Sequence, residues 1–370
     1  MSARQSVAVV GGGVIGCAVA FELARRGVDV SVWDCRAVGA GATQASAGIL
    51  APYIEGHEGG ALLDLTVRGL SVYEGFVESV RSASTTQFEF RRNGTIEIAD
   101  DQDRARELKA RGSLLANAQW LDAEALQESE PSVSANAIGG LLCPEHGYVA
   151  VSDFVRALKE AAEVNGCVFH ENIPVSAVRL EGSKCVLEVG AESNSVNVDR
   201  VVLSVGSWAR ALDPLGELCE RVRPVRGQLL HVHSRSARAE HVLWGPSCYI
   251  VPWTDRTLLL GATSEDVGFD ERSTLAGVSS LIAAATGLLP GLDDASLLGV
   301  RVGLRPATAD GLPIIGPSPA NDLVIYATGH FRNGVLLAPL TAQLIGDLIV
   351  GGTADPMLAL TSVSRYKIEA

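Results

Sequence analysis

The beginning of the chain alternates short apolar runs with one segment of helical spacing. Residues 6–10 form a β-branched run that predicts a strand, and apolar positions in 14–26 recur at helical intervals. Residues 28–34 then alternate into a second strand that ends in an acidic residue. This order predicts a βαβ unit.

The rest of the chain leaves this parallel order and later resumes it. Helices are expected at about 61–82, 151–165 and 275–285, with a closing helix from Gly334. The clearest strands are expected at 94–99, 139–143, near 168, and at 175–180, 186–189, 200–205, 228–233, 249–251, 258–260 and 323–327. Pro339, Gln343 and Asp347 interrupt the apolar stretch 334–350, so a buried helix is predicted there and not a membrane span.

Two interleaved domains account for this order better than two consecutive ones. The sequence contains no internal repeat and no low-complexity linker. We therefore predict an α/β fold that combines a Rossmann-like dinucleotide-binding domain with an interleaved antiparallel-sheet domain. The first is assigned to residues 1–85, 149–220 and 300–370, and the second to residues 86–148 and 221–299.

Composition and charge are typical of a globular protein and limit the classes of partner that it can bind. The 370 residues are 47% hydrophobic and 20% charged, and the formal net charge is −13. No run of Lys or Arg interrupts this negative charge, which argues against nucleic acid and membrane surfaces as partners. The first apolar run lacks a basic leader and is rich in glycine, so it predicts a strand and turn, and a cytoplasmic location is expected.

Cysteine, histidine and serine patterns indicate no other chemistry. The seven cysteines are an odd number without a C-x-x-C pair, which argues against a disulfide framework or a zinc site. His231 and His233 share one face of a predicted strand, but no third ligand stands nearby, so no metal is predicted. Ser207 lacks the second glycine of a nucleophile elbow, which argues against a hydrolase.

A glycine fingerprint joins the first strand to the first helix. Gly11, Gly13 and Gly16 form G-x-G-x-x-G, and Asp34 ends the second strand. The first glycine permits a tight turn, the second lets the backbone approach a diphosphate, and the third lets helix and strand pack closely. The acid accepts a hydrogen bond from a ribose hydroxyl. These residues predict a dinucleotide site but do not show whether the dinucleotide is NAD or FAD.

Further segments narrow this choice. They are the small-residue loop 42–52 (ATQASAGILAP), 249–252 (YIVP), 260–263 (LGAT), 303–308 (GLRPAT) and 329–334 (GHFRNG). In this order, and together with the opening, they resemble the glycine oxidase and D-amino-acid oxidase family of flavoenzymes, with glycine oxidase the nearer pattern. The resemblance covers nearly the whole chain and implies FAD as cofactor. The stretches around Arg305 and His330 contain no cysteine, so the FAD is predicted to be non-covalent.

The resemblance also implies which residues contact FAD. The first turn and Asp34 meet the diphosphate and ribose, the small-residue loop lines the ribityl chain and flavin, and the segment from 329 wraps the flavin ring. The expected contacts are Gly11, Gly13, Val14, Ile15, Gly16, Asp34, Cys35, Ala42, Thr43, Ala47, Gly48, Ile49, Val175, Gly329, His330, Phe331, Arg332, Asn333, Gly334, Val335 and Leu336. The helix that begins at Gly334 is expected to direct its positive dipole end at the flavin.

Three residues are carried over as the catalytic, substrate-side set. Arg305 is expected to bind the substrate carboxylate, because a guanidinium offers a planar fork that matches it. Tyr249 adds a phenolic donor, and Arg332 is a second substrate-side cation, with a surface arginine at a helix start as the alternative. No residue is assigned as an essential base, since the cofactor carries the chemistry.

The implied reaction is FAD-dependent oxidative deamination of a small amino acid. Glycine, sarcosine or a D-amino acid, with water and molecular oxygen, would give an oxo acid, ammonia or an amine, and hydrogen peroxide. Two alternatives stay open: a dehydrogenase of proline-like imino acids that uses another electron acceptor, and a flavin-binding protein without catalysis. The resemblance also allows a role in thiazole, and hence thiamine, biosynthesis, and a homo-oligomer.

The chain departs from the glycine oxidase pattern at two positions. Ser247 and Ser264 stand where that pattern has a histidine and a methionine. If both serines face the substrate, the pocket is larger, and bulkier D-amino acids or N-alkyl glycines are expected to react at least as well as glycine. If both point away, the preference is unchanged.

Overall fold

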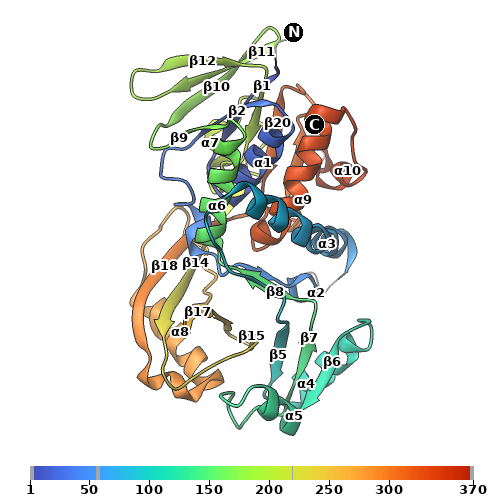
Figure 1. Cartoon of the computed structure of the whole chain (residues 1–370), viewed down its shortest axis with the longest axis vertical. Coiled ribbons are helices and arrows are strands. Elements are labelled where there is room, and N and C mark those ends of the chain that lie inside the picture. Colours follow the sequence, from blue (N-terminus) through green and yellow to red (C-terminus); the bar gives the residue numbers. More distant parts are fainter. Residues whose placement is uncertain (1–3, 56–58, 219, 367–370) are drawn as a thin grey trace.

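Two large sheets occupy opposite halves of an elongated molecule (Figure 1). The computed structural model describes residues 4–55, 59–218 and 220–366. A six-stranded sheet has the strand order β19-β20-β13-β1-β2-β9, and an eight-stranded sheet has the order β18-β14-β17-β16-β15-β5-β7-β6. The predicted mixed α/β class is confirmed by this architecture.

The six-stranded sheet contains the predicted βαβ unit. Its strands are β1 (Ser6–Val10), β2 (Asp29–Trp33), β9 (Val168–His170), β13 (Arg200–Leu203), β19 (Ile314–Pro317) and β20 (Val324–Thr328). All pairings are parallel except that of β19 with β20. A parallel sheet needs both faces covered, which explains the continuous apolar runs that the sequence shows at these strands.

Alternate residues of β1 pack into different layers. Val7 and Val9 join a core with the helices α1 (Val14–Arg25), α3 (Gly60–Ala83), α6 (Val151–Val164) and α9 (Gly334–Gly346). Ala8 and Val10 pack toward a three-stranded sheet of β10 (Val175–Glu181), β11 (Lys184–Val189) and β12 (Asn194–Val198). The parallel sheet is therefore the middle layer of three.

The eight-stranded sheet forms the other half. Its strands are β5 (Thr95–Ala99), β6 (Gln119–Asp122), β7 (Gly139–Cys143), β14 (Arg223–His233), β15 (Val242–Trp244), β16 (Tyr249–Pro252), β17 (Thr257–Gly261) and β18 (Ser296–Ala307). Only β5 and β15 pair in parallel. The helices α4 (Gln102–Gly112), α5 (Ala123–Ser129) and α8 (Leu275–Leu288) accompany this sheet, and α8 covers one face of its core.

Short elements join the two halves. β3 (Ile49–Leu50), β4 (Phe90–Arg91) and β8 (Gly147–Val149) form a small sheet, and β8 is followed directly by α6. The remaining elements are η1 (Ala42–Ala45), α2 (Pro52–Glu55), η2 (Gly206–Trp208), α7 (Ala209–Leu212), η3 (Pro290–Asp294), η4 (Asp347–Gly351), α10 (Met357–Thr361) and η5 (Val363–Arg365).

Most predicted elements are confirmed, and the clearest omission is β18. This strand of 12 residues was not predicted, because glycine and arginine at 299, 301, 303 and 305 interrupt its apolar pattern. Gly303 packs against η1, and Arg301 donates to the carbonyl of Gln44 at 3.5 Å, so these positions do not follow the usual hydrophobic alternation. Residue 300 lies inside β18, which therefore continues through the predicted domain boundary; the boundaries themselves stay a prediction.

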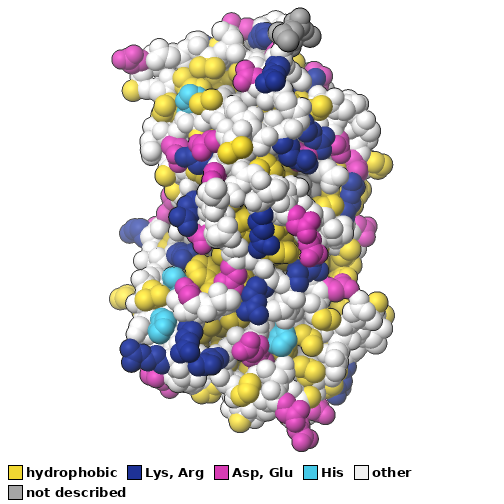
Figure 2. Space-filling view, in the orientation of Figure 1, with side chains coloured by type: hydrophobic (Ala, Val, Ile, Leu, Met, Phe, Trp, Pro, Cys, Tyr) yellow, Lys and Arg dark blue, Asp and Glu magenta, His cyan; other side chains and the backbone are white. Residues whose placement is uncertain are grey.

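The closing helix is apolar because it is interior. The 18 residues Gly334–Gly351 are long and apolar enough to cross a membrane by length and composition, but 67% of the stretch is buried. A core helix passes the same test, as the sequence predicted. On the face shown in Figure 2, acidic and basic side chains are interspersed.

Candidate active site

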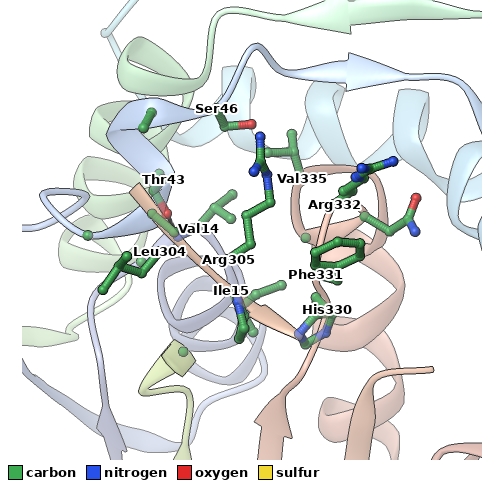
Figure 3. Close-up of a pocket in the computed structure, with 18 of the residues that line it drawn as sticks. Val14, Ile15, Thr43, Ser46, Leu304, Arg305, His330, Phe331, Arg332 and Val335 are labelled. Atoms are coloured by element: carbon green, nitrogen blue, oxygen red, sulfur yellow. Dashed lines mark hydrogen bonds between the residues drawn. The ribbon is translucent and has the colours of Figure 1, made fainter. Parts of the chain in front are cut away.

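A cavity of about 440 Å³ lies where the parallel sheet meets the eight-stranded sheet. The carboxyl ends of β1, β2 and β13 open into it, as is usual for ligand sites of open parallel sheets. η1, β16, β18 and the start of α9 complete the wall. Figure 3 shows Arg305 extending into the middle of this cavity, between the loop that carries Thr43 and Ser46 and the segment from His330 to Val335.

The glycines of the fingerprint make a tight backbone cradle. Gly11 has φ +103°, and a Cβ there would lie 2.4 Å from the carbonyl oxygen of Ser204. A Cβ on Gly16 would lie 1.9 Å from the carbonyl oxygen of Gly11. α1 begins beside them with no side-chain cap at Gly13 and no acidic residue in its first turn. Its positive dipole end therefore faces the cavity and suits a diphosphate.

Asp34 fixes the turn as well as lining the cavity. One carboxylate oxygen accepts the N–H of Gly12 at 2.7 Å, and the other accepts the N–H of Arg36 at 2.8 Å. Arg36 stacks on Trp208 with 4.8 Å from Cζ to the ring centroid, and forms a two-bond ion pair with Glu271. Arg36 and Trp208 also line the cavity and were not predicted from the sequence.

Close backbone approaches shape the other end. Gly48 has φ +73°, and its Cβ would lie 1.9 Å from the carbonyl oxygen of Val149. A Cβ on Gly303 would lie 3.0 Å from Cα of Ala42, so η1 sits directly against β18. The small residues of the loop thus allow the two halves of the molecule to pack closely, and they also leave room for a flat ligand.

The segment after β20 is held by its own hydrogen bonds. Phe331 has φ +47°, and its N–H donates to the carbonyl of Pro306 at 2.9 Å. The His330 ring is buried, with Nε2 3.0 Å from Oγ1 of Thr341. Burial lowers the pKa of His330 to about 3, so the imidazole is neutral at physiological pH. It is a rigid wall of the cavity and does not carry charge.

Arg305 and Tyr249 each lie across a glycine of a neighbouring strand. A Cβ on Gly227 would lie 2.3 Å from the guanidinium nitrogens of Arg305, and a Cβ on Gly261 would lie 2.5 Å from the Tyr249 ring. Arg305 Nη1 donates to the carbonyl of Thr263 at 3.0 Å. The guanidinium is therefore flat against β14 and held at one edge, within the cavity.

Arg332 differs from Arg305 in its orientation. Both line the cavity, but Figure 3 shows the guanidinium of Arg332 directed away from that of Arg305. The Cζ of Arg332 lies 5.1 Å from the Phe331 ring centroid. The structure therefore does not bring the two guanidinium groups together.

Most of the residues expected at the site line this single cavity. Among the expected cofactor contacts Gly16 and Gly329 do not line it, because they act through backbone packing and turn shape. Ser247 lines the cavity, and Ser264 is not among the lining residues. Ser46, Trp208 and Ala262 were missed; Trp208 follows the carboxyl end of β13, and that position could have pointed to it.

The charges of the cavity suit an anionic ligand. Its lining includes Arg36, Arg305 and Arg332, and Asp34 is the single carboxylate among the lining residues in the described part of the chain. Within residues 4–55, 59–218 and 220–366, no group of three or more His, Cys, Asp or Glu side chains could hold a metal ion.

Comparisons with known proteins show which family the chain resembles. The profile of the DAO family, described as FAD dependent oxidoreductase, matches residues 6–348. Glycine oxidase of Geobacillus kaustophilus is 33% identical over 99% of this chain and 98% of its own length. The crystal structure of glycine oxidase from that organism has a TM-score of 0.92 and 32% identity, covering 98% of this chain and 99% of the other.

The chain therefore belongs to the family of FAD-dependent oxidoreductases, and its cofactor is FAD. The bifunctional protein ThiO/ThiG of Nostoc sp. (strain PCC 7120) is 36% identical over 99% of this chain. This chain covers 56% of that relative, so it spans about half the length of the bifunctional proteins it matches.

Proposed function

We propose that this protein oxidises a small amino acid at its amine-bearing carbon, with FAD as cofactor and molecular oxygen as electron acceptor. Amino acid, water and oxygen would give a 2-oxo acid, ammonia or an amine, and hydrogen peroxide. The main supporting observation is Arg305, whose guanidinium lies flat over Gly227 inside the same cavity as the glycine cradle. Glycine oxidase relatives at 30% and 33% identity add support.

The residues fit FAD in a defined order along the cavity. We assign the diphosphate to the start of α1, the adenosine to the end with Asp34, Trp208 and Val175, and the flavin to the end with Gly48 and the start of α9. When bound, the flavin supplies the two-electron oxidation. Among the described lining residues that we assign to the flavin end, the one cysteine is Cys248. It is buried, and burial raises the pKa of its thiol to about 11, so non-covalent binding of FAD is expected.

The chain's own residues would then orient the substrate. Arg305 binds the carboxylate in a partly buried pocket, where a charge-assisted bond is strong, and Tyr249 donates from β16, another strand of the same sheet. Burial lowers the pKa of the neighbouring His330 to about 3, so its ring, which is bonded to Thr341, is a weak proton acceptor and is not assigned as the base. Placement of the α-carbon against the cofactor is thus the protein's contribution to rate.

Anaerobic mixing with glycine, sarcosine, D-alanine and D-proline tests the proposal. We expect at least one of these amino acids to bleach the flavin absorbance near its visible maximum, and peroxide to form once air is admitted. A flavin that no amino acid reduces would contradict the proposal and favour a role without catalysis.

The electron acceptor needs a separate measurement. Stopped-flow reoxidation of the reduced protein in air should be fast enough to support turnover. Slow reoxidation by oxygen, with fast reoxidation by a quinone, would instead favour the dehydrogenase alternative.

Acid precipitation tests whether FAD is bound non-covalently and should leave the yellow colour in solution. Colour in the pellet would contradict non-covalent FAD.

The role in thiazole biosynthesis is a further part of this proposal. It is supported by the name ThiO/ThiG of the bifunctional relative, of which this chain spans about half. A cytoplasmic location and a homo-oligomer are likewise retained as predictions.

A further inference from the structure

A polar network lies on the face of β14 opposite the cavity. Arg226 and Gln228 flank Gly227 in the strand, so their side chains point away from Arg305. Oε2 of Glu265 accepts from Arg226 Nη2 at 2.6 Å. Its Oε1 accepts from Gln228 Nε2 at 2.7 Å and from Thr263 Oγ1 at 2.6 Å. One carboxylate therefore binds three side chains behind the substrate wall.

The same carboxylate anchors the backbone that follows β17. Regular pairing of β17 ends at Gly261, but residues 263–265 continue along β14. The N–H of Arg226 donates to the carbonyl of Glu265 and the reverse bond is also made, both at 2.9 Å. The N–H of Gln228 donates to Oγ1 of Thr263 at 2.9 Å. The N–H of Thr263 also donates to the carbonyl of Gln228 at 3.1 Å, so backbone and side-chain bonds together fix this short segment against β14.

This segment and β14 each supply a carbonyl that accepts from Arg305. Nη1 of Arg305 lies 3.0 Å from the carbonyl oxygen of Thr263 and 3.4 Å from that of Arg226. Both residues are bound by Glu265 on the other face. A shift of either carbonyl would turn the guanidinium, and a bidentate carboxylate pair depends on its plane.

Glu265 is suited to this role by its charge. Burial raises the pKa of its carboxyl, but hydrogen bonds from Arg226, Gln228 and Thr263 outweigh burial and lower the pKa to about 2. The group is ionised at neutral pH and acts as an acceptor only. Arg226, its cationic partner, is 4% exposed.

We propose that Glu265 is a positioning residue for amino-acid binding: by fixing Thr263 and Arg226 it orients the guanidinium of Arg305 toward the substrate carboxylate. The inference rests on the proposed function. It assigns Glu265 no contact with substrate or FAD, and Glu265 is not among the residues that line the cavity.

A purely structural role, neutralising buried Arg226, makes a different prediction. Asp270 also pairs with Arg226, with 3.0 Å between Oδ2 and Nη1, and it accepts hydrogen bonds from Arg272. Asp270→Asn therefore weakens the neutralisation of Arg226 and leaves the bonds from Glu265 to Thr263 and Gln228 in place. It is the matched control for Glu265→Gln.

The test compares Glu265→Gln, Thr263→Val and Asp270→Asn with the unmodified holoenzyme. Bound FAD is measured from the visible absorbance, and kcat and KM are measured with the best amino acid. The dissociation constant of glycolate, a small carboxylate without an amine, is measured from its perturbation of the flavin spectrum. For Glu265→Gln we expect KM and the glycolate dissociation constant to rise about tenfold, with kcat within about twofold.

Each outcome decides the inference. Thr263→Val should show the same direction as Glu265→Gln with a smaller change, and Asp270→Asn should match the unmodified protein. Equal effects of Glu265→Gln and Asp270→Asn, or unchanged glycolate binding in Glu265→Gln, would overturn it. If the unmodified protein is reduced by no amino acid but binds glycolate, the proposed function fails while the positioning of Arg305 remains testable through glycolate alone.

Discussion

The two sides of the cavity use glycine for different purposes. In the cradle, an added Cβ at Gly11 or Gly16 would meet backbone at 2.4 and 1.9 Å. In the opposite wall, which we propose to bind the substrate, an added Cβ at Gly227 or Gly261 would meet the side chains of Arg305 and Tyr249 at 2.3 and 2.5 Å. The cradle glycines thus shape the chain itself, whereas the wall glycines make room for functional groups.

This difference determines how well substitutions of these glycines should be tolerated. Backbone at the cradle cannot move without opening the turn between β1 and α1, so substitution there should destroy cofactor binding. A long side chain such as Arg305 can rotate to a new position, so substitution beneath it should spare the fold and FAD and change only the substrate site.

The largest effect is expected for Gly16→Ala. The clash with the carbonyl of Gly11 should prevent the helix from packing on β1, so the purified protein should be colourless or fail to accumulate. Gly75→Ala in α3 is the control, because nothing lies within 4 Å of its added Cβ. Visible absorbance and thermal unfolding measure both. A yellow Gly16→Ala protein with normal FAD content would break the assignment of the cradle.

Arg305→Leu should keep FAD and lose the substrate. Removal of one partner from a charge-assisted pair costs about 2–5 kcal/mol, so kcat/KM should fall between roughly 30-fold and several thousand-fold. Arg223→Leu is the control, since Arg223 is an exposed arginine of β14 that pairs with Asp266. Steady-state kinetics and flavin content give the comparison. Near-normal kcat/KM would move the carboxylate site elsewhere, with Arg332 next to be tested.

Gly227→Ala displaces the guanidinium of Arg305 without removing it, so a smaller effect than that of Arg305→Leu is expected. We expect full FAD content and a fall in kcat/KM of about 10- to 100-fold, because the guanidinium must leave its place over β14. Gly299→Ala in β18 has no atom within 4 Å of the added Cβ and should behave normally. If Gly227→Ala lost FAD as Gly16→Ala is expected to, the two kinds of glycine would not be distinct.

The smallest effect is expected at Ser247. Because Ser247 lines the cavity, Ser247→His should reduce its volume, and the ratio of kcat/KM for D-proline to that for glycine should fall several-fold. Ser264→Met should leave the ratio unchanged, since Ser264 is not a lining residue. Equal behaviour of the two variants would show that the space beside Ser247 does not hold the substrate side chain.

Local patterns in the sequence determined the cradle. Gly11, Gly13, Gly16 and Asp34 predicted the βαβ unit and the dinucleotide site, because the turn, the helix start and the acid lie within one short stretch of chain. The order of motifs predicted the family, which the comparisons confirm. The segments 303–308 and 329–334 were selected by resemblance, not by their spacing.

The residues that meet around Arg305, in the wall proposed to bind the substrate, could be found only from the tertiary structure. Gly227, Thr263 and Arg305 are far apart in sequence and meet through pairings of β14 with its two neighbours. No periodicity shows that a glycine lies under a distant arginine, or that Glu265 binds Arg226 from behind. β18 was missed for the same reason: its Gly303 packs against η1 and its Arg305 enters the cavity, so its pattern reflects contacts that form only after folding.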